Sequence, residues 1–129
     1  MNLNLKLLAD VYCILKFAPN ARLPAFIYDS DFYSVTRTPE EISVVTRQES
    51  LIKEAISCDK DWRILKIDGI LDFSLVGIIA ELTQIFKENE IPVFIISTYN
   101  TDYCLLKQKY TEKAIKVLKN KGHKVQLDN

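Results

Sequence analysis

Few residues of this 129-residue chain have the types and spacing that catalysis requires. The sequence has one histidine, His123, and three widely spaced cysteines, Cys13, Cys58 and Cys104. Covalent catalysis needs a nucleophile beside a base, and only Cys58 or Cys104 with His123 could supply that pair. No phosphate-loop, dinucleotide or Gly-x-Ser-x-Gly motif occurs, and the cysteines lack zinc-site spacing. The sequence therefore predicts a protein that is not an enzyme, with no metal site and no cofactor.

The same residues have structural interpretations. Cys13 and Cys104 lie inside apolar runs, so we expect both to be small buried hydrophobic residues. His123 follows a predicted helix, where a solvated or dipole-stabilised imidazole is expected. The lysines from Lys113 to Lys124 are expected to form a solvated helix face, because 17 basic and 17 acidic residues leave the chain without net charge.

The elements that position the polar residues are clearest in the second half of the chain. Residues 62–67 are apolar and β-branched and end at Asp68 and Gly69, which predicts a strand and a turn. From Phe73 to about Asn89 the apolar residues recur at intervals of three and four, which predicts a helix with Asp72 as its N-cap. The remaining predicted elements are strand 93–96, buried on both faces, turn 99–102, strand 103–106, a helix capped by Thr111 and closed by Gly122, and strand 125–127.

The first half is predicted to be rich in strands. Residues 3–8 and 12–17 could form a hairpin about Ala9 and Asp10. Residues 32–37 and 42–46 flank Pro39, which predicts a second hairpin. A short helix is predicted over residues 50–56, with Ser50 as its cap.

The two halves resemble each other in the order of caps, turns and strands. Residues 14–17 match residues 64–67 at an offset of 50, and residues 36–45 align with residues 97–106 at an offset of 61. The difference of 61 − 50 = 11 residues corresponds to the long helix that the first copy lacks. We therefore expect two domains, residues 1–61 and 62–129, with the strand at 62–67 closing the first copy and opening the second.

Two segments carry a family resemblance, residues 72–77 at the start of a helix and residues 97–103 between two strands. Together they resemble the ACT-domain family, and above all its small bacterial paired-ACT proteins, which are similar to aspartokinase regulatory modules and to cytosolic arginine sensors. The resemblance runs from about Tyr12 to Val125. It implies an α+β fold, a ferredoxin-like βαββαβ ACT fold in two tandem ACT-like units, the first of them degenerate.

The resemblance also implies a regulatory amino-acid site at an interface between ACT modules. Backbone N–H groups at a strand–turn–helix junction can hold a carboxylate, and an acid can bind the ammonium through charge-assisted hydrogen bonds. We expect Asp102 to contact the ammonium. The ligand-binding candidates carried over by position are Gly69, Ile70, Leu71 and Asp72 at the junction, and Asn100, Thr101 and Asp102 on the facing turn.

Each candidate also has a purely structural interpretation. Asp72 could be only the helix N-cap, in which case its carboxylate would fill the anion site. Gly69 could serve only the turn, and residues 100–102 are ordinary turn formers. Tyr99 and Tyr103 could pack on the sheet or line the site.

The composition limits the partners of the chain. Its zero net charge disfavours binding to nucleic acid or to an anionic membrane, and no signal peptide or membrane-spanning stretch is visible. The sequence thus favours a cytoplasmic, non-catalytic regulatory module that binds an amino acid or a similar zwitterion and forms a homodimer. The alternative is a structural or protein-interaction ACT dimer without a ligand.

Overall fold

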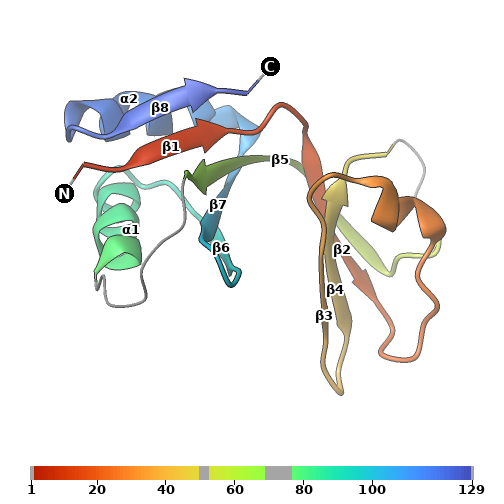
Figure 1. The fold of residues 1–129 in the computed structure, drawn as a ribbon. Coiled ribbons are helices and arrows are strands. Elements are labelled where there is room, and N and C mark those ends of the chain that lie inside the picture. Colours follow the sequence, from red (N-terminus) through yellow and green to blue (C-terminus); the bar gives the residue numbers. More distant parts are fainter. Residues whose placement is uncertain (1, 50–52, 69–76, 129) are drawn as a thin grey trace. The chain divides into compact units, whose positions relative to one another are not determined.

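The computed structural model describes residues 2–49, 53–68 and 77–128. The chain folds into two compact units, unit 1 (residues 1–9 and 63–129) and unit 2 (residues 10–62). Both are visible in Figure 1, and each is described by itself. The first nine residues belong to unit 1, whereas the sequence analysis assigned them to the N-terminal domain.

Unit 1 is a mixed sheet with two α-helices. Its strands lie in the order β8-β1-β5-β7-β6. Leaving out β1, the chain order is β5-α1-β6-β7-α2-β8, the predicted ferredoxin-like βαββαβ fold. The elements are β1 (Asn4–Leu7), the second part of β5 (Ser57–Ile67), α1 (Ile78–Glu88), β6 (Phe94–Ser97), β7 (Asp102–Lys107), the 3-10 helix η2 (Gln108–Tyr110), α2 (Thr111–Asn120) and β8 (Lys124–Leu127).

Strand β1 lies between β5 and β8, antiparallel to the former and parallel to the latter. The predicted hairpin between residues 3–8 and 12–17 is therefore wrong. Leu5 and Leu7 are buried in the core of unit 1, whereas Tyr12–Phe17 forms β2 in unit 2. The apolar side chains of β1 and β2 are buried in two separate cores, and this burial outweighs the short connection that would favour a hairpin.

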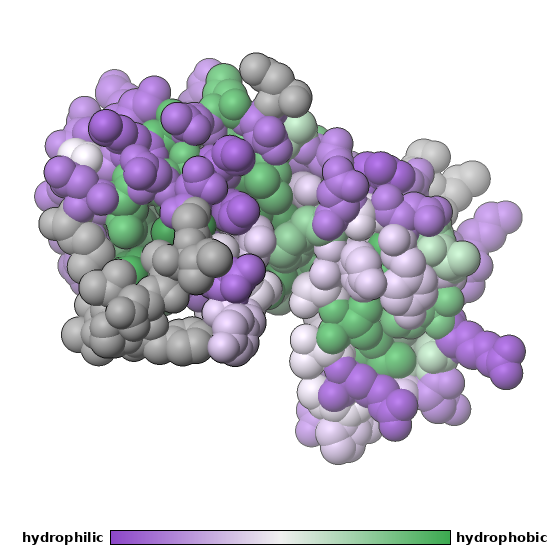
Figure 2. Space-filling view, in the orientation of Figure 1, coloured by the Kyte–Doolittle hydropathy of each residue, from purple (hydrophilic) through white to green (hydrophobic). Residues whose placement is uncertain are grey.

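The helices bury one face each, as their apolar spacing predicts. Helix α1 buries Ile78, Leu82, Ile85 and Phe86 in the core. Helix α2 buries Ala114 and Leu118. Lys113, Lys116 and Lys119 are exposed, so the solvated lysine face is confirmed, and Figure 2 shows mostly hydrophilic residues over this part of unit 1. None of the helices in the described residues is long and apolar enough to span a membrane.

The helix ends differ in part from the prediction. The N-cap of α1 is Gly77, with φ of 87°, and Asp72, which we expected as the cap, lies outside the described residues. The N-cap of α2 is Tyr110, and the Thr111 hydroxyl makes no hydrogen bond. At the C-terminal end of α2 the prediction is confirmed, because Gly122 has φ of 92° and donates to the Lys119 carbonyl.

Unit 2 is an antiparallel sheet in the order β3-β4-β2-β5, to which β5 contributes its first part. Its described residues contain no α-helix, in agreement with a degenerate first copy. Thr38 closes the predicted β3–β4 hairpin, since its hydroxyl accepts the N–H groups of Glu40 and Glu41. The other elements are β2 (Tyr12–Phe17), the 3-10 helix η1 (Ala25–Asp29), β3 (Ser34–Arg37) and β4 (Ile42–Arg47).

Strand β5 supplies a strand to both units. Its residues from Ser57 to Trp62 pair with β2, and those from Leu65 to Ile67 pair with β1. One strand thus contributes to both units, but its part in unit 2 is Ser57–Trp62, and of the predicted residues 62–67 only Trp62 pairs with β2. The short helix predicted over 50–56 is wrong at residues 53–56, which are irregular. Strand β6 is only half-buried, and not buried on both faces, because it pairs with β7 alone among the described strands.

The imidazole of His123 is buried, with 3% of the residue exposed, so of the two predicted alternatives, a solvated or a dipole-stabilised ring, the solvated ring is wrong. Its Nδ1 accepts the backbone N–H of Leu3 at 3.0 Å, just before β1. Its Nε2 lies 3.7 Å from Oε2 of Glu81 on α1. The ring therefore joins β1, α1 and the α2–β8 connection, and neither of its nitrogens contacts a cysteine.

We predict that His123→Leu destabilises the chain by about 1–3 kcal/mol, the usual effect of leaving a buried donor unsatisfied. The leucine fills the site but gives the Leu3 N–H no acceptor. Urea unfolding of the full chain measures the change. Lys124→Ala is the matched control, because that side chain is exposed; equal midpoints for the two variants would contradict the structural role of His123.

Candidate functional site

The turn between β6 and β7 is attached to the end of β5. Thr101 is buried, and its Oγ1 donates to the carbonyl oxygen of Ile67 at 2.7 Å. Ile67 is the last residue of β5, and Gly69 follows two residues later. The contact therefore holds the predicted turn against the end of β5, and the predicted junction from Gly69 to Asp72 begins just after that strand end.

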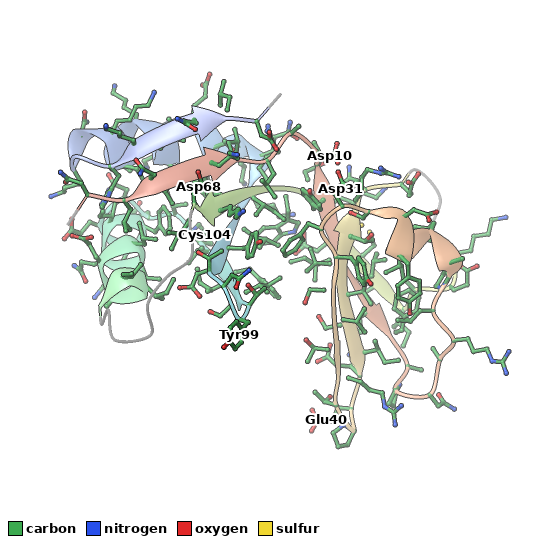
Figure 3. All side chains as sticks on the ribbon, in the orientation of Figure 1. Asp10, Asp31, Glu40, Asp68, Tyr99 and Cys104 are labelled. Carbon is green, nitrogen blue, oxygen red and sulfur yellow. The ribbon has the colours of Figure 1, made fainter. Side chains whose placement is uncertain are left out.

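The turn itself is closed by two threonines. The N–H of Thr98 donates to the Thr101 carbonyl at 2.9 Å, and Thr98 Oγ1 bonds to the same carbonyl at 3.1 Å. Asn100 and Tyr99 are exposed, Tyr99 by 84%, and Figure 3 shows Tyr99 at the tip of the hairpin. The Thr101 side chain is therefore committed to the backbone, while Asn100 is free to meet solvent or a ligand.

Asp102 is the first residue of β7 and not part of the turn, opposite Ser97 of β6. It is half-buried and lies on the same face of β7 as Cys104, since side chains two residues apart in a strand share a face. Burial, together with the negative charge of Asp102, raises the pKa of the Cys104 thiol to about 12. Among the residues that the structure describes, no side chain pairs with the Asp102 carboxylate, which leaves it able to bind a cation.

The start of α1 is the second polar feature of this region. Its N-cap, Gly77, has no side chain to bond the first N–H groups of the helix, and among the described residues no other side chain caps them. The sequence analysis did not single out Gly77. Its signal was present, because Gly77 is the one glycine between Asp72 and the helix, and φ of 87° favours glycine. Gly69, Ile70, Leu71 and Asp72 lie outside the described residues.

Two depressions on the surface of the described residues lie away from the predicted site. One of about 520 Å³ is lined by Pro19, Asn20 and Arg37–Pro39, and the other of about 370 Å³ lies over β2, β4 and the start of β5. Both belong to unit 2, and no predicted site residue lines them. In the described part of the chain, no three His, Cys, Asp or Glu side chains are grouped to hold a metal ion.

Two family models match the sequence. The model of the ACT domain matches residues 57–120, and a model of an N-terminal domain matches residues 10–54. No curated protein matches the chain.

The fold is found in several solved structures. A protein of Agobacterium tumefaciens is 28% identical with a TM-score of 0.91, over 100% of this chain and 96% of its own. The ligand-free regulatory subunit of aspartate kinase from Thermus thermophilus is 14% identical with a TM-score of 0.60, over 86% of this chain and 92% of its own. The allosteric aspartate kinase of Clostridium acetobutylicum is 10% identical with a TM-score of 0.63, over 87% of this chain and 33% of its own.

We predict that Thr101→Val lowers the stability of the chain by about 1–3 kcal/mol, because the buried Ile67 carbonyl loses its donor while the side-chain volume hardly changes. Thr101→Ser keeps a hydroxyl and is the matched control. Urea unfolding of both variants checks the prediction, which fails if valine and serine give the same midpoint.

Proposed function

Because residues 57–120 match the model of the ACT domain, we propose that this chain is a regulatory module of the ACT-domain family that binds a free amino acid or a similar small zwitterion. The ligand binds at an interface between ACT modules, at the edge of unit 1 where β5 ends and β7 begins. The observation that carries the proposal is the acid Asp102, which has no side-chain partner among the described residues and directly follows the turn that Thr101 holds against the end of β5.

The carboxylate of the ligand is bound by backbone N–H groups of the segment from Gly69 to the first turn of α1. The N-terminus of a helix attracts anions through its free N–H groups and its dipole. Gly77 at the N-cap supports this assignment, because it has no side chain that would compete with the ligand for these N–H groups.

The ammonium of the ligand is bound by Asp102. A half-buried carboxylate without a partner among the described residues gains a charge-assisted hydrogen bond from an ammonium group. Asn100 on the exposed turn supplies a further polar contact, whereas Thr101 positions the turn through its bond to Ile67 and does not need to touch the ligand.

The regulatory part of the proposal is supported by the relatives. The solved structures with the same fold include a regulatory subunit of aspartate kinase and an aspartate kinase described as allosteric. In this proposal the chain has no catalytic residue. It responds to an amino acid and passes the signal to a partner protein.

A thermal-shift screen of the full chain against the standard amino acids at millimolar concentration tests the proposal. We expect one amino acid, or a few chemically related ones, to stabilise the fold, by about 2.7 kcal/mol when the ligand is at 100 times its Kd. Absence of a shift with every amino acid would count against an amino-acid ligand and in favour of a purely structural domain.

Isothermal titration of Asp102→Asn with the ligand found in the screen tests the site. Hydrogen bonds to charged groups contribute about 1.5–3 kcal/mol, so we expect affinity to fall about 10- to 100-fold. Asp31→Asn, a substitution at an exposed aspartate of unit 2, is the control and keeps wild-type affinity. If Asp102→Asn also keeps it, the ammonium is bound elsewhere.

We also propose that the chain forms a homodimer through the outer edge of β6. Phe94, Ile95 and Ile96 are half-buried, and β6 pairs only with β7 among the described strands. The backbone N–H and C=O groups along an edge strand can pair with a strand of another chain. Light scattering should give twice the chain mass, and Ile95→Lys should give the monomer; a monomeric wild type at all concentrations would exclude the dimer.

A further inference from the structure

Two cysteines of unit 2 lie on neighbouring strands. Cys13, on β2, is fully buried in the core with Leu15 and Phe17. Its Sγ lies 3.7 Å from the carbonyl oxygen of Thr46 on β4. The register of β2 with β5 shifts between Tyr12 and Ile14, so Cys13 lies at a β-bulge.

Cys58, on β5, lies on the same face of this sheet. It is paired directly with Leu15, and directly opposed residues in a ladder point to the same side. Leu15 and Cys13 are two residues apart on β2 and also share a face. Cys58 is therefore the diagonal cross-strand neighbour of Cys13 on the core side of the sheet.

The two thiols interact with each other. Burial, followed by the charge and a side-chain hydrogen bond of Cys58, raises the pKa of the Cys13 thiol to about 12. This interaction and the shared face make the two side chains neighbours, as a disulfide requires.

The accessibility of the two sulfurs differs. Cys58 is exposed, and it lines the depression of about 370 Å³ over the start of β5. Cys13 is buried and can be reached only from its neighbours. A small reagent from solvent therefore meets Cys58 first, and Cys13 stands next to it as the second thiol.

We propose that Cys13 and Cys58 are a reversible dithiol–disulfide pair, with Cys58 as the thiol that reacts first and Cys13 as the resolving thiol. The oxidant is a small hydroperoxide. Under oxidising conditions a disulfide bond forms between β2 and β5 inside unit 2, and a thiol reductant reduces it again.

The reaction balances in two steps. The Cys58 thiolate attacks one oxygen of hydrogen peroxide and breaks the O–O bond, which gives a sulfenic acid and hydroxide; the proton lost by Cys58 converts that hydroxide to water. The Cys13 sulfur then attacks the Cys58 sulfur, forms the S–S bond and expels hydroxide, which takes the Cys13 proton. Two thiols and one peroxide give one disulfide and two water molecules.

The test is a thiol count on the full chain after treatment with hydrogen peroxide, followed by peptide mapping under non-reducing conditions. Wild type should fall from three free thiols per chain to one, and the peptides that contain Cys13 and Cys58 should be linked to each other. Dithiothreitol should restore all three thiols.

Two variants make the assignment specific. In Cys58→Ser the remaining thiols, Cys13 and Cys104, are both buried, and neither should be lost. In Cys104→Ala the disulfide should form as in wild type. The proposal is overturned if Cys58 stops at a sulfenic or sulfinic acid while Cys13 stays free, or if Cys58 instead joins two chains.

Discussion

The hydrogen bond from the Thr101 hydroxyl to the Ile67 carbonyl is the contact on which the candidate site depends. At 2.7 Å it is buried, and it links the β6–β7 turn to the last residue of β5. A buried carbonyl without a donor is costly, so the turn stays at the strand end. The next residue, Asp102, is thereby held close to the end of β5. It is half-buried and lies on the same face of β7 as the buried Cys104. The position of the acid thus follows from the bond made by its neighbour.

The packed core around this site extends beyond the segment matched by the ACT-domain model. That segment covers residues 57–120, yet the core of unit 1 also contains Leu5 and Leu7 of β1. The ring of His123, beyond the segment, accepts the N–H of Leu3 and so fixes the start of β1. Both ends of the chain therefore complete the sheet that carries the site, which explains why the sheet has β1 between β5 and β8.

The sequence predicted the features whose causes are local and missed those that depend on distant partners. The apolar spacing of α1 and the turn residues about Pro39 involve only neighbouring residues, and the helix and the β3–β4 hairpin that they predict are confirmed. The hairpin predicted at Ala9 was wrong because separate cores bury the two strands. His123 looked exposed because the groups that bury it, Leu3 and Glu81, lie far from it in sequence. At the site, sequence patterns indicated the turn, but they could not show that Thr101 serves the backbone.

A crystal structure of the chain with the amino acid that stabilises it most would test the central claim, which is that the edge of unit 1 binds a zwitterion. The expected structure has the ligand carboxylate within hydrogen-bonding distance of the N–H groups that lead into α1, and its ammonium on the Asp102 carboxylate. An amino acid bound at another place, with Asp102 still without a ligand contact, would contradict the claim.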